Sequence, residues 1–181
     1  MGVEKGKQQL GVEFAQTADR YCEMVQGREG NSAEELLRAL HTLIPELYFR
    51  ASLLPELEPE SEQLLPPAMT DEEWQQLYRA LGTTLGNYNS YWEVFDPIEV
   101  TRRDPIRTSL ADDLADIYRD LKGGLIAATA ANGSIPTDVI WHWRYRFTSH
   151  WGQHAMSAMR AIHSHMFMHD LAESSEESED A

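Results

Sequence analysis

Apolar residues recur every three or four positions along most of this chain, which is the spacing of one buried face of a helix. The clearest run consists of Leu36, Leu40, Leu43, Leu47, Ala51 and Leu54. No stretch alternates between apolar and polar residues for long enough to predict a strand. The sequence therefore predicts an all-α fold. We expect a single compact bundle of about five helices, a size that suits 181 residues.

Capping residues and helix breakers set the expected limits of these helices. Ser32 with Glu35, and Thr70 with Glu73, have the spacing of a capping box, in which each side chain bonds the backbone amide of the other residue. The apolar stripe of the second helix continues in phase past Pro45, so we expect one kinked helix there. The expected helices cover 8–27, 32–54, 71–85, 109–131 and 136–171.

Two segments between these helices do not fit the helical pattern. Residues 55–69 contain four prolines and four glutamates and are typical of a connecting loop. Residues 86–108 are unusual for a solvated loop because they contain Tyr88, Tyr91, Trp92 and Phe95. A connection this long is normally packed or functional, so we expect a packed aromatic loop or a short helix, with a helical turn over 88–95. Ser109 is then the expected N-cap of the fourth helix.

Charge and cysteine content limit the partners and the location. The chain has 15 basic and 30 acidic residues and a formal net charge of −15. Such a body repels phosphate backbones and anionic lipids, so we expect a protein partner, with no nucleic acid and no membrane. Five acids lie in 172–181, which predicts a disordered acidic tail after a domain spanning 1–171. The single cysteine, Cys22, excludes an internal disulfide, is expected to be a buried inert thiol, and favours a reducing, cytoplasmic location.

The segment SLADDLADIYRDLK, residues 109–122, carries a cluster of carboxylates. At about 100° per residue, four of them fall within one arc of the predicted helix: Asp112, Asp113, Asp116 and Asp120. Like charges four positions apart cost about 0.2–0.5 kcal/mol per pair. Asp116 and Asp120 are too far from the helix start to be compensated by its dipole, so they indicate a tertiary partner: an arginine, a histidine or a cation. The alternative is a solvated face with Arg119 and Lys122 as counter-charges.

The segment HWGQH places His150 and His154 four residues apart on the last predicted helix. Buried imidazoles need hydrogen-bond partners, and the aspartate face is the natural source. Three interpretations stay open. The cluster is a structural network joining helices four and five, a metal site using the two histidines with Asp116, or a catalytic site with a histidine as general base. The DDxxD pattern also occurs in magnesium-binding diphosphate sites, but no second acidic motif accompanies it here.

Four segments together resemble a known family: LYFRASLLPEL (47–57), LGNYNSYWEVFDP (85–97), SLADDLADIYRDLKGGL (109–125) and WHWRYRFTSHWGQHAMSAMRAIH (141–163). In these segments the chain is similar to the bacterial domain of unknown function 5063 family. The resemblance extends from the first helix to about Ala172. It implies a compact, all-helical, bacterial and cytoplasmic domain, and it transfers no activity and no catalytic residue.

The sequence leaves two main functional hypotheses. A non-enzymatic interaction or accessory module is favoured by the acidity and by the absence of a nucleophile motif or a glycine-rich phosphate loop, so no cofactor is expected. The alternative is a metal-dependent hydrolase acting on a phosphate-containing substrate through Asp112, Asp116, His150 and His154, which needs a divalent metal. A third hypothesis, mimicry of nucleic acid by the acidic body, is weakened because much of the charge lies in the tail.

Overall fold

The computed structural model describes residues 2–27, 32–61, 65, 68–94, 98, 101, 104–131 and 134–168. Its elements are α1 (Gly2–Gln26), α2 (Ala33–Ser52), α3 (Asp71–Leu85), the 3₁₀ helix η1 (Gly86–Asn89), β1 (Ser90–Glu93), β2 (Ile106–Ser109), α4 (Leu110–Ala130), α5 (Thr137–Arg146), the π-helix η2 (Phe147–Trp151) and α6 (Gly152–Phe167). The predicted all-α class is confirmed, with one small two-stranded sheet added within the described part. The predicted tail, 172–181, lies outside the described residues.

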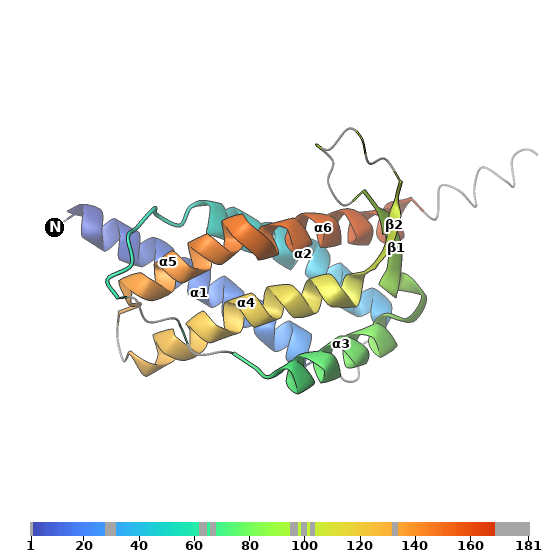
Figure 1. The fold of residues 1–181 in the computed structure, drawn as a ribbon, viewed down its shortest axis with the longest axis horizontal. Coiled ribbons are helices and arrows are strands. Elements are labelled where there is room, and N and C mark those ends of the chain that lie inside the picture. Colours follow the sequence, from blue (N-terminus) through green and yellow to red (C-terminus); the bar gives the residue numbers. More distant parts are fainter. Residues whose placement is uncertain are drawn as a thin grey trace, which may run out of the picture.

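Four helical rods form the main bundle. α1 packs on α2 and α4, and α6 packs on the same two helices, so these rods close around a common centre. α3 packs against another side of α4, which therefore has neighbours in α1, α3, α5 and α6. Figure 1 shows the rods running along the length of the molecule, with α3 and the β-hairpin at the same end. No helix among the described residues combines the length and the apolar character needed to cross a membrane.

Buried apolar side chains from all the helices form a continuous core, whose largest fully buried members include Trp143, Trp151, Tyr21 and Phe14. Trp143 packs directly on the backbone of α4, where its Nε1–H donates to the carbonyl of Leu121 at 3.2 Å. A Cβ at Gly124 would lie 2.1 Å from that Nε1, so only glycine permits this approach. The close contact holds α5 against α4, next to the aspartate face.

The helix starts in α2 and α3 confirm the sequence reading. Ser32 with Glu35, and Thr70 with Glu73, form complete capping boxes, each with both reciprocal bonds. Pro45 lies inside α2, which runs as one helix past it. These features were predictable because capping boxes and helix continuity depend only on residues close in sequence.

The start of α4 is capped differently from the prediction. Ser109 occupies the N-cap position, but its side chain makes no capping bond. The Asn89 Oδ1 atom instead accepts the backbone N–H of Ala111 at 2.8 Å and the hydroxyl of Ser109 at 3.1 Å. A residue twenty positions earlier therefore satisfies the free amides of α4. This cap ties the aromatic segment to the helix that carries the aspartates.

The aromatic segment corrects the predicted helical turn over 88–95. A short helix does form, but it covers only Gly86–Asn89, after which Ser90–Glu93 pairs with Ile106–Ser109 as an antiparallel hairpin. Tyr88 and Tyr91 pack against the core as expected, whereas Trp92 is 65% exposed. Phe95 lies outside the described residues. Four-residue strands are too short for a period-two signal, which explains why the sequence did not reveal them.

The last predicted helix is one continuous rod, Thr137–Phe167, with a π segment in its middle. In that segment the Gly152 amide bonds the carbonyl of Phe147, five residues back. A Cβ at Gly152 would lie 2.4 Å from that carbonyl oxygen, so the widened turn requires glycine. The hydroxyls of Thr148 and Ser149 donate to carbonyls of the preceding turn. The π segment contains His150 and ends shortly before His154, so it sets where these two candidate site residues lie.

Candidate metal centre between α4 and the last helical rod

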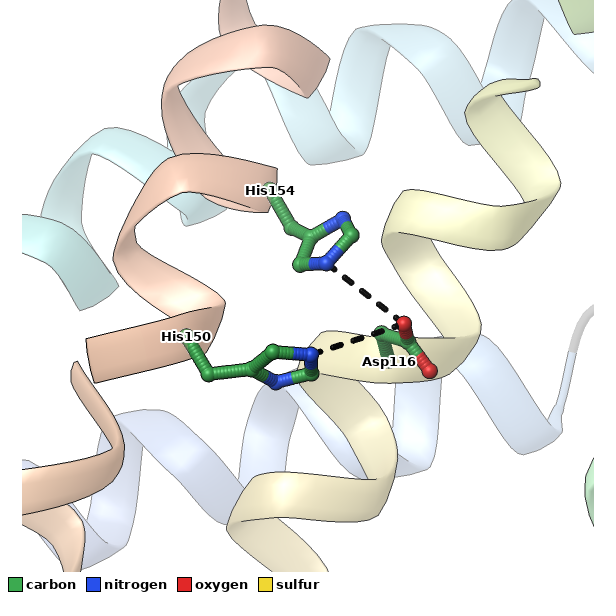
Figure 2. A group of neighbouring side chains, drawn as sticks. All are labelled: Asp116, His150 and His154. Atoms are coloured by element: carbon green, nitrogen blue, oxygen red, sulfur yellow. Dashed lines mark ion pairs between the residues drawn. The ribbon is translucent and has the colours of Figure 1, made fainter. Parts of the chain in front are cut away.

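The aspartate face of α4 and the two histidines lie against each other inside the fold. Asp113, Asp116 and Asp120 are only 3%, 8% and 3% exposed. His150 in η2 and His154 in α6 are half-buried. Figure 2 shows both imidazoles pointing from their rod toward Asp116 on α4. The juxtaposition expected from the two helical faces is therefore present.

Each imidazole has its Nδ1 atom held by a different aspartate carboxylate. His150 Nδ1 lies 2.7 Å from Asp120 Oδ2, and His154 Nδ1 lies 2.9 Å from Asp113 Oδ1. An ionised carboxylate can only accept a hydrogen bond, so in both rings the Nδ1 atom carries the proton. In a neutral imidazole this leaves the lone pair on Nε2. The same carboxylate–histidine pairing is found behind most histidines that bind metals.

Both Nε2 atoms face a single oxygen of Asp116. The Asp116 Oδ2 atom lies 3.5 Å from His154 Nε2 and 3.9 Å from His150 Nε2 (Figure 2). One ligand atom from each of the three residues lies within 4.8 Å of the others. In a tetrahedral zinc site, ligand atoms stand about 3.3 Å apart, so an inward movement of the side chains would bring these three atoms to coordination distance.

This arrangement brings three electron pairs together. With both Nδ1 atoms protonated, His150 Nε2, His154 Nε2 and Asp116 Oδ2 each present a lone pair to the same small space. Such a set is stabilised by a metal ion, by a proton on one imidazole or by a water molecule that donates to it. The separations of 3.5 Å and 3.9 Å show that no direct hydrogen bond of normal length joins these atoms, which leaves room for a bound ion or water.

The second oxygen of each carboxylate is bound from other parts of the fold. Asp116 Oδ1 accepts Nε1–H of Trp74 at 2.9 Å and pairs with Arg119 at 2.7 Å. The remaining oxygens take two further partners, a salt bridge from Arg146 to Asp120 Oδ1 and a hydrogen bond from the Tyr91 hydroxyl to Asp113 Oδ2. Every buried aspartate is therefore fixed on one side and directed at histidine on the other. Such fixing holds the ligands in place before any ion arrives.

The pKa values indicate a shortage of positive charge in the cluster. Burial raises the pKa of Asp113, although hydrogen bonds from His154 and Tyr91 oppose the shift. Burial and the neighbouring charge of Asp116 raise the pKa of Asp112. Burial alone would lower the pKa of His154, but its bond to Asp113 and the surrounding carboxylates raise it instead. All three groups hold protons more tightly than usual, as expected where a positive charge is needed.

A count of formal charges gives the same result. Among the described residues of the cluster, Arg119 and Arg146 offset two of the four aspartates. With neutral histidines, a charge of two units remains to be balanced. A single divalent cation would balance that negative charge. Leaving the charge unbalanced in a buried setting would be costly.

Each residue predicted for the site can now be placed. Asp116, His150 and His154 supply the converging atoms, while Asp113 and Asp120 orient the histidines. Asp112 is half-buried beside them but is not part of the converging set within the described residues. The solvated-face alternative for the aspartates is wrong, since three of the four are buried. Of its proposed counter-charges, Arg119 does pair with Asp116, whereas Lys122 lies over the Tyr118 ring.

Trp74 and Tyr91 belong to the site but were not expected there. Tyr91 was expected only as part of the aromatic segment 86–108, and Trp74 lies in α3. Both are half-buried, with the ring packed on the core and the polar group donating to an aspartate. Tyrosine and tryptophan commonly combine the two roles. The sequence did contain a clue, because buried aspartates need hydrogen-bond donors, and the indole N–H and the phenol O–H are such donors.

The fold and site define a helical-bundle domain with a candidate two-histidine, one-carboxylate metal centre. The family model named Domain of unknown function (DUF5063) matches residues 6–168, and the chain belongs to that family. Among solved structures, the fold is similar to a crystal structure of protein BF1032 from Bacteroides fragilis. The two are 24% identical with a TM-score of 0.72, over 84% of this chain and 89% of the other. No curated protein sequence matches the chain significantly.

Proposed function

We propose that this chain is a metal-binding protein that holds one divalent first-row ion between Asp116 Oδ2, His150 Nε2 and His154 Nε2. The proposal rests on one observation. His150 Nε2, His154 Nε2 and Asp116 Oδ2 converge on one space, while carboxylates hold the Nδ1 atoms of both imidazoles. Two histidines and one carboxylate suit zinc in hydrolases and iron in non-haem oxygenases. A structural network that satisfies itself would not need both Nε2 atoms directed at one acceptor.

A metal centre with three protein ligands leaves coordination positions for water and substrate, which is the arrangement of catalytic rather than structural sites. An ion held by these three side chains would supply Lewis-acid chemistry suited to hydrolysis. Asp112 lies close enough to interact with the charges of both histidines, and burial raises its pKa, which makes it a stronger proton acceptor than a free aspartate. These features support a metal-dependent hydrolase as the activity. The arginines beside the centre favour an anionic substrate, including one with a phosphate group.

Metal stoichiometry tests the proposal directly. The full chain, purified without a histidine tag and stripped with a chelator, is titrated with zinc, manganese or ferrous iron by calorimetry. We expect one equivalent to bind, and we expect His150→Ala and His154→Ala to lose about 100-fold or more in affinity, since each removes a ligand. His163→Ala is the matched control, an exposed histidine on the same helix as His154. Equal losses in all three variants, or no stoichiometric binding by the wild type, would overturn the proposal.

An interaction or accessory role is the second candidate, and a separate observation favours it. Large apolar side chains are exposed on the hairpin and on α6, with Trp92 65%, Met168 59%, Met156 50% and Phe167 46% exposed. Exposed aromatic residues and methionines are enriched in protein–protein interfaces. Metal binding and partner binding use different surfaces of the chain, so the two roles are compatible.

A cytoplasmic location stays part of the proposal. Its support is chemical. The single cysteine, Cys22, is buried as a free thiol, and a reducing compartment preserves such thiols. The expected preference for protein partners over nucleic acid and membranes rests on the net charge of −15.

A further inference from the structure

A cavity of about 280 Å³ lies beside the candidate metal centre, between the middle of α4 and the second half of α5. Arg119 and Asp120 from α4 and Arg146 from α5 supply its polar lining, and these residues contact the candidate metal centre directly or through one partner. Trp141 and Tyr145 from α5 also line the cavity, with Met69 from the segment before α3. The volume suits one ring with a small substituent, just below the usual range for drug-sized ligands.

The polar lining can bind an anion. Arg119 and Arg146 each use the Nη2 atom to contact an aspartate. A guanidinium has five N–H donors in a planar fork, so both side chains keep donors for a ligand. Their side chains are 36% and 31% exposed, which leaves them reachable from the cavity while burial strengthens their bonds.

Two aromatic rings also line the cavity. The rings of Trp141 and Tyr145 stack with centroids 5.2 Å apart and planes 5° from parallel. These residues are four positions apart on α5, so the helix itself sets the stack. Tyr145 is 51% exposed, and no packing in the core accounts for this pair. An aromatic pair that lines the same cavity as two guanidinium groups suits a ligand that has a flat apolar ring and a negative charge.

We propose that this cavity binds a small aryl anion, with its carboxylate or phosphate group on Arg119 and Arg146 and its ring against Trp141 and Tyr145. The ligand would be the substrate, or the acidic product, of the metal centre, and that role rests on the proposed function. Binding itself needs only the cavity. The cavity and the metal centre share Asp120, so a bound acid group lies on the side of the cavity nearest His150.

The test compares four small probes on the full chain, both zinc-loaded and metal-free, by calorimetry and ligand-observed NMR. Benzoate and phenyl phosphate carry the required charge, benzyl alcohol is neutral and benzylamine is cationic. We expect saturable binding of one anion at one site, at least tenfold tighter than the alcohol, and no binding of the amine. A preference for benzoate or for phenyl phosphate identifies which acid group the site accepts.

Two variants and two matched controls locate the binding. Arg119→Gln and Tyr145→Ala should each weaken anion binding about tenfold, whereas Arg38→Gln and Trp92→Ala, which change an exposed arginine and an exposed aromatic residue elsewhere, should not. Equal binding of all probes, or equal effects in variants and controls, overturns the inference. Stoichiometric zinc without anion binding rejects the cavity ligand alone. Anion binding by a chain that binds no metal rejects the proposed function and the substrate role, while the cavity assignment stands.

Discussion

Single atoms decide the chemistry of the candidate centre. In Asp113 and Asp120, one oxygen holds a histidine Nδ1 and the other is fixed by Tyr91 or Arg146. In Asp116 the division is different, since Trp74 and Arg119 hold one oxygen and the other faces both Nε2 atoms. The three aspartates therefore have distinct roles, although the sequence shows them as one acidic face. Substitutions of the same kind should separate these roles.

Asp113→Asn should weaken metal binding without removing a ligand. Its amide oxygen still accepts the Nδ1–H of His154, but the lost charge makes Nε2 a poorer ligand, so we expect affinity to fall about 10–100-fold. Asp116→Asn removes the ligand oxygen's charge and should cost more. Zinc titration of both variants, with the exposed Asp19→Asn as control, checks this order. An Asp113→Asn protein as tight as the control would show that the carboxylate does not support the ligand.

Cys22 should be inert in the folded protein. Burial raises the pKa of its thiol to about 12, and the nearby Asp19 and Glu23 raise it while Lys122 lowers it. The pKa of the thiol is higher in the folded protein than in the unfolded chain. The buried neutral thiol therefore contributes to the stability of the fold below about pH 9, and this contribution is lost as the pH rises toward 12. A thiol reagent at about pH 8 should react fully only after a denaturant is added. Rapid reaction of the native protein would contradict the burial of this residue.

At the scale of elements, the π segment sets the position of the histidines. It adds a wide turn just before His154, so a helical wheel with constant rotation misplaces every residue after Phe147. The hairpin contributes in a similar way, since it carries Tyr91 and follows the Asn89 cap of α4. Both irregular elements serve the same site. The regular helices bring the two faces together, and these exceptions adjust the geometry.

Gly152→Ala should destabilise the protein because its Cβ would meet the Phe147 carbonyl at 2.4 Å. We expect a loss of about 1–3 kcal/mol in the free energy of unfolding, typical of overpacking a buried position, and weaker metal binding as the histidines shift. Gly6→Ala is the matched control, a helical glycine with open space around it, and should be neutral or slightly stabilising. Urea denaturation of both variants measures the difference. Equal stabilities would mean that the π turn accommodates a side chain.

The regular features were predictable from sequence, and the irregular ones were not. The capping boxes at Ser32 and Thr70 and the single helix through Pro45 rest on neighbouring residues, so local rules sufficed. The Asn89 cap joins residues more than twenty positions apart, and the hairpin strands are separated by a long connection. Such pairings depend on tertiary packing. For the site, the two helical faces were predicted, but the division of each carboxylate between two partners required the fold.

At the scale of the whole molecule, part of the negative charge of the chain lies in its interior. Three aspartates are buried in one cluster, although carboxylates are rarely buried without partners. The pKa values of Asp112, Asp113 and His154 are raised, so the metal-free fold binds more protons at these groups than the unfolded chain does. A bound ion would replace those protons. The stability of the molecule should therefore depend on pH and metal together.

The metal-free protein should lose stability as the pH rises. Groups with raised pKa values stabilise the fold fully below their ordinary values, 3.8 for Asp112 and Asp113 and 6.5 for His154, and this contribution disappears above the raised ones. Without metal, we expect the free energy of unfolding to fall as the pH rises above 6.5, the ordinary pKa of His154, and saturating zinc to restore it, most strongly at the higher pH. In His154→Gln both effects should shrink. Stability that is independent of pH and zinc would contradict the charge shortage.

The most direct measurement is anomalous X-ray scattering at the zinc edge from a crystal of the stripped chain after zinc is added. The account predicts one strong peak about 2.0–2.2 Å from His150 Nε2, His154 Nε2 and Asp116 Oδ2, with Asp113 and Asp120 still on the Nδ1 atoms. The contrary result is no peak, with one imidazole drawn into a direct hydrogen bond of about 2.8 Å to Asp116. A proton would then be the cation that joins these helices, and the centre would hold no metal.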